Sequence, residues 1–465
     1  MCGQDFPCLL HSLALIGALP KSCLGGARGE LFIQRGALMK NRTSHSYGDP
    51  HRWVAFSVIC WVYFFVYFHR VSTSVIVTDL LEAFHTHATA LGLMSSMYFY
   101  LYAFEQPLVG YLSDRLGPRR VIGYWTLAAA AGCFIFGMAP NIGWASAGRA
   151  LIGLGVGGVY VPAVKAISQW FRKEEFATMI GLLMSVGNFG AVIATTPLAW
   201  ATAVWGWRAT FFLISGITLV LAFVTLFFTR DFDGPSPPVP GDSGTASGSG
   251  AGTGAKVMQV LTSGQFWILS TIFFGFYGTL LTLQGLWATP FLMTALGVER
   301  IFASKLNMLI PVGVIIGAPF LGWLTGRFSL DKRKTLMVIL TLYTLTWVGV
   351  TFFPSQLSTL GLSLVILLMG IVGGGFVSTL WGIVRDILPP EILGLTSGIL
   401  NLWPFLGVGA FQVLTGAVLD RAGRVGELYP LSGFKNAFFI CLSGMVVCLV
   451  LSFFLKLKPW SLRSN

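Results

Sequence analysis

The sequence predicts an all-α, polytopic membrane protein whose twelve transmembrane helices form two six-helix, pseudo-symmetric bundles. Three observations lead to this fold class: a low content of charge, twelve long apolar runs and an internal repeat. Of the 465 residues, 55% are hydrophobic and only 10% are charged, whereas about 25% are charged in a typical soluble domain. A chain with so few charges cannot cover its surface with polar groups in water, so lipid is the solvent that suits it.

The apolar runs fall into two sets of six, and each run approaches the roughly 20 residues that a spanning helix needs. The first set covers residues 53–78, 89–111, 121–140, 144–170, 176–203 and 208–229. The second set covers residues 266–293, 303–326, 335–353, 359–385, 394–419 and 434–457. We therefore expect an N-terminal bundle (53–230) and a C-terminal bundle (266–458).

Three polar segments flank the bundles. Residues 234–255 consist mostly of Gly, Ser and Pro without periodicity, a composition typical of a flexible, solvated tether. We assign the cytoplasmic linker to 231–265. Residues 1–52 are expected to form a cytoplasmic extension, in which Met39 offers an alternative start, and residues 459–465 a cytoplasmic tail.

The net charge of +12 has two candidate explanations, nucleic-acid binding and membrane topology. Topology is favoured because the basic residues occupy short gaps between apolar runs, and Lys and Arg mark cytoplasmic loops. This places both termini and the linker in the cytoplasm, and the short loops favour a bacterial inner membrane. The basic residues assigned to the cytoplasmic side are Arg115, Arg119, Arg120, Arg172, Lys173, Arg230, Lys256, Arg327, Lys332, Arg333, Lys334, Lys456 and Lys458.

The two sets of runs also resemble each other in sequence. Residues 107–121 read PLVGYLSDRLGPRRV, and residues 319–334 read PFLGWLTGRFSLDKRK. The glycine pair 157–158 in the first half aligns with the pair 374–375 in the second. Two six-helix repeats with a site at their interface near the bilayer midplane form a transporter architecture. We therefore expect the functional site to lie between the bundles.

Residues 110–120, GYLSDRLGPRR, resemble the signature loop that joins the second and third helices in the major facilitator superfamily. The run Arg149-ALIGLGVGG resembles the fourth-helix motif of that superfamily, and the Gly-Trp-Arg run at 206–208 also fits its pattern. The resemblance covers residues 53–457 and implies the fold of a twelve-helix transporter.

The resemblance also implies a gating role for the loop, in which Asp114 and its neighbours latch the outward-open state and separate as the two halves rock. We expect Gly110 to permit a close helix crossing, and Gly117 with Pro118 to force the turn. A solvated turn with a topological charge cluster is the alternative. The residues assigned to this gating loop are Gly110, Asp114, Arg115, Gly117, Arg119 and Arg120.

Ionisable side chains inside apolar runs are costly in lipid, so they are strong candidates for a functional site. In the first run, Tyr63, Tyr67, Arg70 and Ser74 are spaced four, three and four residues apart, which places them on one helical face. Arg70 needs an anion, either a protein carboxylate or a substrate, and its fork of donors suits a carboxylate or a phosphate. An Arg after Tyr-x-x also resembles the organic-anion branches of the superfamily, which carry sugar acids and organophosphates. Snorkelling toward the outer surface is the alternative for Arg70.

Residues of the second half are expected to complete the substrate site. Tyr277 and Gln284 are seven residues apart on one face of the seventh helix, and the repeat brings Gln284 near the counterpart of Arg70. Asn401 and Trp403, with the proline that follows, interrupt the eleventh helix, and such breaks are tolerated where they face a cavity. A packing kink is the alternative for these two residues.

Two further ionisable residues are assigned to coupling. Arg149 opens the fourth helix, and its match to the superfamily motif implies a role in proton or substrate coupling. Its alternative is an Arg bound to backbone carbonyls. Glu105 in the second helix is a candidate proton site, whose alternatives are a partner for an inner-gate Arg or a side chain that reaches the aqueous mouth. We therefore expect the proton to be the coupling ion.

Together these features predict a secondary active transporter that moves a small solute, in particular an organic anion, by proton-coupled, rocker-switch alternating access. Proton-coupled efflux of drugs or hydrophobic compounds is a second hypothesis, and a transporter-like receptor without flux is a third. The sequence shows no soluble-enzyme motif and no ATP-binding domain. We expect no enzymatic activity, no cofactor, no metal, no nucleic-acid partner and a monomeric state.

Overall fold

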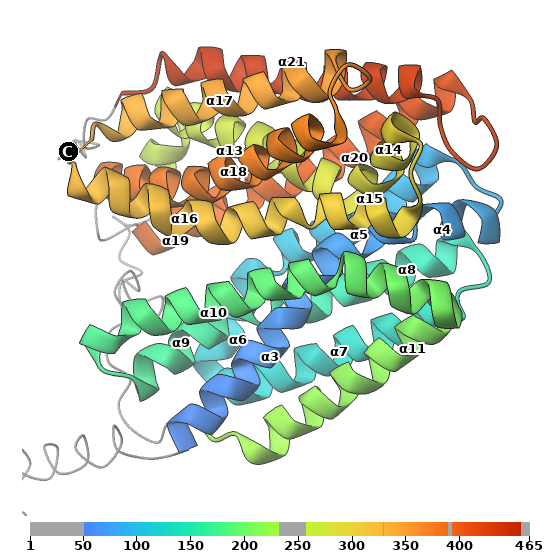
Figure 1. Cartoon of the computed structure of the whole chain (residues 1–465). Helices are drawn as coiled ribbons and strands as arrows, with labels where there is room; N and C mark the ends of the chain where they lie inside the picture. The colour runs from blue at the N-terminus through green and yellow to red at the C-terminus, as the bar shows by residue number, and fades with distance from the viewer. Residues whose placement is uncertain (1–50, 232–256, 329, 389–392, 457–465) are drawn as a thin grey trace, which may run out of the picture.

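The computed structural model describes residues 51–231, 257–328, 330–388 and 393–456. Figure 1 shows two helical bundles stacked on each other, with the N-terminal half in blue to green and the C-terminal half in yellow to red. Most of the extension, the Gly/Ser/Pro tether and the tail predicted at 459–465 lie outside the described residues, as do Met39, Lys256 and Lys458.

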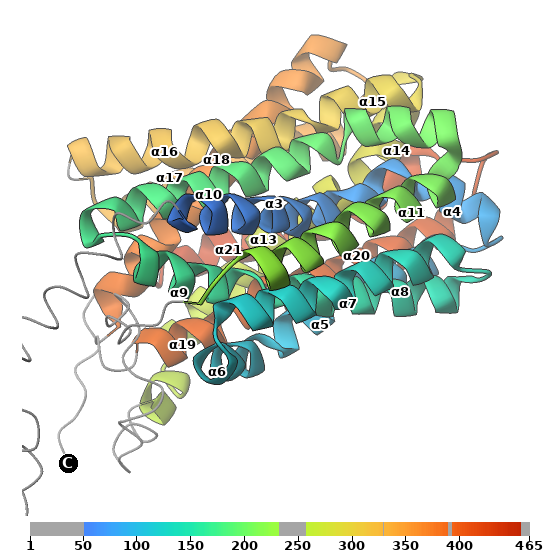
Figure 2. The ribbon, with the colours of Figure 1, turned by 90° about the horizontal axis from the view of Figure 1, so that it is seen from below.

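The N-terminal bundle extends from α3 to α11, and most of its helices run roughly parallel to one axis in both Figure 1 and Figure 2. Its elements are α3 (His51–Val71), η1 (Ser72–Val75), α4 (Val77–Ala83), α5 (Ala88–Phe104), α6 (Gln106–Leu116), α7 (Pro118–Met138), α8 (Ile142–Gly157), α9 (Tyr160–Trp170), α10 (Lys173–Ile193) and α11 (Thr196–Phe228).

The C-terminal bundle repeats this arrangement from α13 to α21. Its elements are α13 (Gly264–Thr282), η2 (Leu283–Trp287), α14 (Ala288–Leu296), α15 (Arg300–Asn307), α16 (Leu309–Arg327), α17 (Lys332–Phe352), α18 (Thr359–Ile387), α19 (Leu393–Leu400), α20 (Leu402–Ala422) and α21 (Leu431–Ser452).

The described helices account for the twelve predicted spans. Eleven segments of the described chain are long and apolar enough to cross a membrane. The remaining predicted span corresponds to α5 and α6, which are separated only by Glu105, a residue with helical backbone angles (φ −82°, ψ −13°). The prediction of an all-helical, twelve-span membrane fold is therefore confirmed.

The predicted boundary between the fifth and sixth spans differs from the structure. The fifth span was expected at 176–203, but α10 ends at Ile193 and α11 begins at Thr196. Pro197 lies in the first turn of α11, where its missing N–H has no helical partner to lose. Residues 196–203 therefore belong to α11, which kinks farther along at Gly206 (φ 77°, ψ 157°).

Close backbone packing joins α5 to α20 across the two bundles. A Cβ added at Gly92 would lie 2.4 Å from the carbonyl oxygen of Gln412, and one added at Gly416 would lie 2.5 Å from that of Ala88. Small residues allow this approach, which is a common basis of helix packing in membranes. The contact therefore depends on both glycines.

Polar contacts also join the bundles at the end of the molecule where Figure 1 shows α4, α14 and α15, and we call this the closed end. Ser74 Oγ lies 3.1 Å from Thr289 Oγ1, and the Asn307 amide donates to Ser74 Oγ at 3.2 Å. Arg300 of α15 forms an ion pair with Asp79 of α4. Burial raises the pKa of the Asp79 carboxyl, and Arg300 opposes that shift.

The closed end includes a helix cap that crosses between bundles. His87, at the start of α5, provides no side-chain cap. Instead, the Asp420 carboxylate of α20 accepts hydrogen bonds from the backbone N–H of Ala88 at 2.7 Å and of Thr89 at 2.8 Å. The Tyr429 hydroxyl donates to the same carboxylate at 2.9 Å. We call the opposite end, where α6, α9 and Asp231 lie, the linker end.

Candidate functional site

Arg70 lies in the last turn of α3, at the interface of the two bundles, and is only 5% exposed. Its guanidinium lies over three aromatic rings, 4.5 Å from the centroid of Tyr67, 5.1 Å from that of Tyr102 and 5.4 Å from that of Phe405. Phe405 belongs to α20, so rings from both bundles enclose the cation. The attraction of a guanidinium to a ring face explains this placement.

The Arg70 charge has no acidic partner among the ion pairs of the described chain. The nearby Tyr98 hydroxyl donates to the Val66 carbonyl at 2.9 Å. The buried Nε of Arg70 has no hydrogen-bond partner. A buried cation without a counter-charge is costly, so this position favours an incoming anion. The ion pairs of the described residues are Arg52–Glu175, Lys165–Asp114, Arg300–Asp79, Lys332–Asp386 and Arg385–Asp386.

Further aromatic side chains of both bundles pack against the rings that surround Arg70. The Tyr63 ring lies 5.4 Å from Tyr67 and 5.8 Å from Tyr160, and on the other side the Tyr277 ring lies 6.2 Å from Phe405. The sequence predicted three of these residues, whereas spacing gave no indication of the others because they meet only through tertiary packing. We call the group the aromatic cage, and its members are Tyr63, Tyr67, Tyr102, Tyr160, Tyr277 and Phe405.

Gln284 is buried in a turn where the seventh span changes its helical geometry. Residues Leu283–Trp287 form a π-helical turn, a feature that often marks functional positions. The Gln284 carbonyl accepts a hydrogen bond from the Asn307 amide at 3.1 Å. A Cβ added at Gly285 would lie 2.6 Å from the Arg70 carbonyl oxygen. The segment that carries Gln284 therefore packs against the backbone of Arg70, and a role for Gln284 in substrate binding stays a prediction.

The predicted interruption of the eleventh span is present, because α19 ends at Leu400 and α20 begins at Leu402. Asn401, between them, is half-buried. Trp403 packs edge-on against Trp267, with ring centroids 5.2 Å apart. Phe405 instead reaches Arg70, since two residues along a helix turn the side chain by about 200°. The structure thus places Phe405 on the guanidinium and places Trp403 on Trp267.

Glu105 lies inside the N-terminal bundle. One carboxylate oxygen, Oε2, accepts a hydrogen bond from Trp125 Nε1 at 2.8 Å. The other oxygen, Oε1, is buried without a hydrogen-bond partner and faces Gly157, where an added Cβ would lie 1.7 Å away. Glu105 is therefore a buried carboxyl with one free acceptor, and it forms none of the ion pairs of the described residues.

Arg149 is completely buried in α8, with 0% exposure. Its Nη1 donates to the His69 carbonyl at 3.0 Å, and its guanidinium lies 5.0 Å from the Tyr98 ring centroid. Nε and Nη2 have no hydrogen-bond partner. The contact with a backbone carbonyl matches one of the two predicted roles.

The loop between α6 and α7 forms the turn that the sequence predicted. Gly117 has a positive φ of 82°, and Pro118 begins α7. The Asp231 carboxylate accepts a hydrogen bond from the Arg119 backbone N–H at 2.9 Å, and Arg119 Nη1 donates to the Thr229 carbonyl at 3.3 Å. A side chain at Gly117 would collide with Asp231, which an added Cβ would approach to 2.6 Å.

The other gating-loop residues lie near the surface of the N-terminal bundle. The Asp114 carboxylate pairs with Lys165 Nζ of α9 at 2.6 Å, and the latch that the resemblance implies for the outward-open state stays a prediction. Arg115 is exposed and lies over the Tyr111 ring, and Arg120 is exposed as well. The close crossing expected at Gly110 is absent in this conformation, because an added Cβ there would meet no atom within 4 Å.

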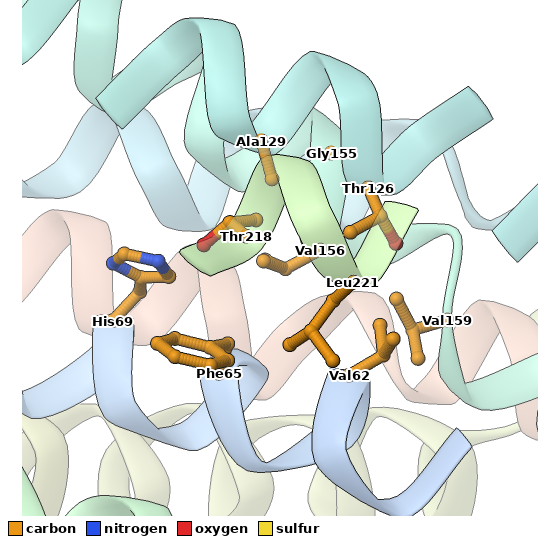
Figure 3. A pocket seen from close by; sticks show the side chains of 10 residues that line it. All are labelled: Val62, Phe65, His69, Thr126, Ala129, Gly155, Val156, Val159, Thr218 and Leu221. Atoms are coloured by element: carbon orange, nitrogen blue, oxygen red, sulfur yellow. The ribbon is translucent and has the colours of Figure 1, made fainter. Parts of the chain in front are cut away.

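A small cavity of about 10 Å³ lies inside the N-terminal bundle, separate from the aromatic cage. Figure 3 shows His69 and Phe65 at one side of it, with Val156, Thr218 and other mostly apolar side chains around it. This volume is close to the minimum that holds one water molecule. The cavity is therefore too small for an organic solute.

The sequence of this chain is similar to a known protein family. Residues 59–412 match the family model of the Major Facilitator Superfamily. The uncharacterized transporter YybO of Bacillus subtilis is 26% identical over 87% of this chain and 94% of its own length. The probable sulfoacetate transporter SauU of Cupriavidus necator is 23% identical over 82% of this chain and 90% of its own length.

A solved structure has the same fold. The bacterial homologue of the human lysosomal transporter Spinster, in an inward-facing and unoccupied conformation, superposes with a TM-score of 0.69. The match covers 88% of this chain and 97% of that chain at 17% identity. The family and its relatives are transporters, so the prediction that the chain is not an enzyme is confirmed. The chain belongs to the Major Facilitator Superfamily.

Proposed function

We propose that this chain is a secondary active transporter that moves a small organic anion across the membrane, in symport with protons, by alternating access of its two bundles. The observation that carries the proposal is Arg70, a buried cation at the bundle interface that forms none of the ion pairs of the described chain. A guanidinium presents donors that match a carboxylate or sulfonate.

The names of the relatives support the same class of substrate. SauU is named for sulfoacetate, a small organic acid with two anionic groups. Rings from both bundles enclose Arg70, so it can bind an anionic group. A movement of either bundle would change the contacts around this residue. A cation substrate would instead need a carboxylate at this interface, and the carboxyl of Glu105 faces Trp125 within one bundle.

We assign the linker end to the cytoplasm because Lys and Arg concentrate in the loops there. Helix α3 begins and α21 ends toward this same side (Figure 1), and this supports cytoplasmic termini. The closed end then faces outward, so the conformation described here is one in which the outer access is shut. The short loops favour a bacterial inner membrane, and we propose a monomer as the transport unit. The described basic residues at the linker end include Arg115, Arg119, Arg120, Arg172, Arg230, Arg327, Lys332, Arg333 and Lys334.

Arg70→Gln is expected to weaken uptake of the substrate anion by about 10- to 100-fold, the loss that follows from removing hydrogen bonds to a charged partner. The measurement is uptake by proteoliposomes with a panel of labelled organic acids that includes benzoate, with one anionic group, and sulfoacetate, with two. Arg208→Gln is the matched control, because Arg208 also stacks on a ring and donates to a carbonyl, yet lies away from the cage. Uptake at the wild-type level in Arg70→Gln contradicts the proposed anion site.

Glu105→Gln is expected to abolish stimulation of uptake by an inwardly directed proton gradient. Its Oε1 has no hydrogen-bond partner and can take a proton without breaking the bond from Trp125 to Oε2. The amide keeps the shape of the carboxylic acid but cannot release the proton. Uptake is compared with and without a pH gradient, and Glu175→Gln is the control because Glu175 pairs with Arg52. A gradient response that persists in Glu105→Gln excludes this residue as the proton site.

A further inference from the structure

We infer that the aromatic cage selects an organic monoanion with a planar, unsaturated body, that is, an aromatic monocarboxylate or monosulfonate. The inference rests on the proposed function, because it takes Arg70 as the anchor of the transported anion. It adds the number of charges and the shape of the substrate, which neither the family nor the names of the relatives provide.

The cage offers charge for one anionic group. Arg70 is the cation whose guanidinium lies over its rings. Arg149 lies beyond Tyr98, is completely buried and donates to the His69 carbonyl. Lys165 pairs with Asp114. A second anionic group on the substrate would therefore enter the cage without a counter-charge of its own, and an unpaired buried charge is strongly disfavoured.

Three ring faces lie over the guanidinium, and a thioether lies beside the hydroxyls of two cage tyrosines. The hydroxyls of Tyr63 and Tyr67 both point to Met184 Sδ, at 3.4 and 3.8 Å. Thioether sulfur is a weak acceptor but a polarizable neighbour for aromatic rings. A polyhydroxy acid needs several strong hydrogen-bond partners when it leaves water. This surface suits an apolar, planar body better than a chain of hydroxyl groups.

Three members of the cage are only half-buried, namely Tyr67, Tyr160 of α9 and Tyr277 of α13, whereas Tyr63, Tyr102 and Phe405 are buried. Tyr67 lies under the guanidinium, so Tyr160 and Tyr277 are the two that remain for the body of the substrate. The Tyr160 ring lies 5.8 Å from Tyr63 and the Tyr277 ring 6.2 Å from Phe405, within the spacing of about 4.5–7 Å that aromatic pairs prefer. A substrate anchored at Arg70 would place its ring against one tyrosine from each bundle. Both bundles would therefore contribute to the selection of a planar substrate.

The first test compares ligands on the purified, full-length protein by thermal stabilisation, since a ligand of the native state raises apparent stability by mass action. The panel contains benzoate and phenylacetate as aromatic monoanions, hexanoate as an aliphatic monoanion, gluconate as a polyhydroxy monoanion, and phthalate as an aromatic dianion. The aromatic monoanions are expected to bind about tenfold more tightly than the other three, through ring contacts and the single matched charge. Arg70→Gln is expected to remove the binding of all of them.

The second test separates the rings from their hydroxyl groups. Tyr277→Leu and Tyr160→Leu are expected to weaken benzoate binding about fivefold, the range of one aromatic pair, and to weaken hexanoate binding by a clearly smaller factor, because leucine still covers an aliphatic chain. Tyr277→Phe and Tyr160→Phe keep the ring and are expected to bind benzoate as the wild type does. These positions do not stack on the guanidinium, so the Arg70 anchor is retained.

The outcomes distinguish this inference from the proposed function. Tighter, Arg70-dependent binding of gluconate, phthalate or hexanoate overturns the aromatic preference and leaves the anion site in place. An equal loss of benzoate and hexanoate binding in the leucine variants overturns the role of the rings. If no anion in the panel, nor any in the uptake assay, depends on Arg70, the proposed function itself fails and this inference fails with it.

Discussion

Gly92→Leu is expected to abolish transport while both bundles remain folded. The backbones of α5 and α20 meet at this residue, where an added Cβ would lie 2.4 Å from the Gln412 carbonyl oxygen and 2.9 Å from its carbon. A backbone atom cannot move aside as a flexible side chain can, and overpacking of this kind costs about 1–3 kcal/mol or more. The closed end is therefore expected to lose population by about 10- to 100-fold relative to an open end.

The Gly92 prediction is measured by uptake and by labelling of a reporter cysteine. Ser74 is 1% exposed in the closed end, so Ser74→Cys is expected to react with a membrane-impermeant maleimide only when Gly92→Leu is also present. Gly216→Leu is the matched control, because an added Cβ at Gly216 meets no atom within 4 Å. Normal uptake and an unlabelled cysteine in Gly92→Leu contradict the requirement for this crossing.

Arg149→Met is expected to be more stable than the wild type and inactive. Arg149 is completely buried, forms none of the ion pairs of the described chain, and leaves Nε and Nη2 without hydrogen-bond partners. Replacing a buried charge by an apolar side chain of similar volume often stabilises a protein by about 1–4 kcal/mol. The lost hydrogen bond to His69 reduces that gain. Inactivity is expected because Arg149 holds the His69 carbonyl next to Arg70 in the chain, and gains in stability often come with losses of function.

The Arg149 prediction is checked by the apparent melting temperature in detergent together with uptake by proteoliposomes. Arg208→Met is the control, because Arg208 makes the same kinds of contact, with the Ala139 carbonyl and the Trp207 ring, at an exposed position. That variant is expected to keep the melting temperature and uptake of the wild type. A lower melting temperature for Arg149→Met shows that its contacts outweigh the cost of burying the charge.

The spans were predictable because lipid imposes one simple requirement, a run of apolar residues long enough to cross it. An apolar run does not show the boundary between two helices when no polar loop separates them. Residues 176–203 read as one continuous apolar run, yet the chain turns between Ile193 and Thr196 inside it. The span of α5 and α6 shows the reverse case, since Glu105 interrupts the helix but the chain continues along it.

The candidate site was predictable only in part. Arg70 was found because an ionisable residue in an apolar run is rare, and Tyr63 and Tyr67 followed from helical spacing. Phe405 carries no such signal, because one Phe among 38 in the chain looks like any other lipid-facing residue. Its role depends on the orientation of α20 about its own axis after the break at Asn401. This orientation places Phe405, and not Trp403, over the guanidinium. Spacing within one helix does not contain that information.

The cap that Asp420 places on α5 has a consequence for how the closed end would separate. The first turn of α5 is completed by a residue of the other bundle, and His87 offers no replacement. When the bundles part, the amides of Ala88 and Thr89 lose their acceptors at once, and a helix terminus without a cap frays. Separation therefore includes a local order-to-disorder step, and the bundles do not move as fully rigid bodies. The free energy of that step depends on how well water replaces one carboxylate, so the pH and salt of the solution at the closed end enter the equilibrium directly.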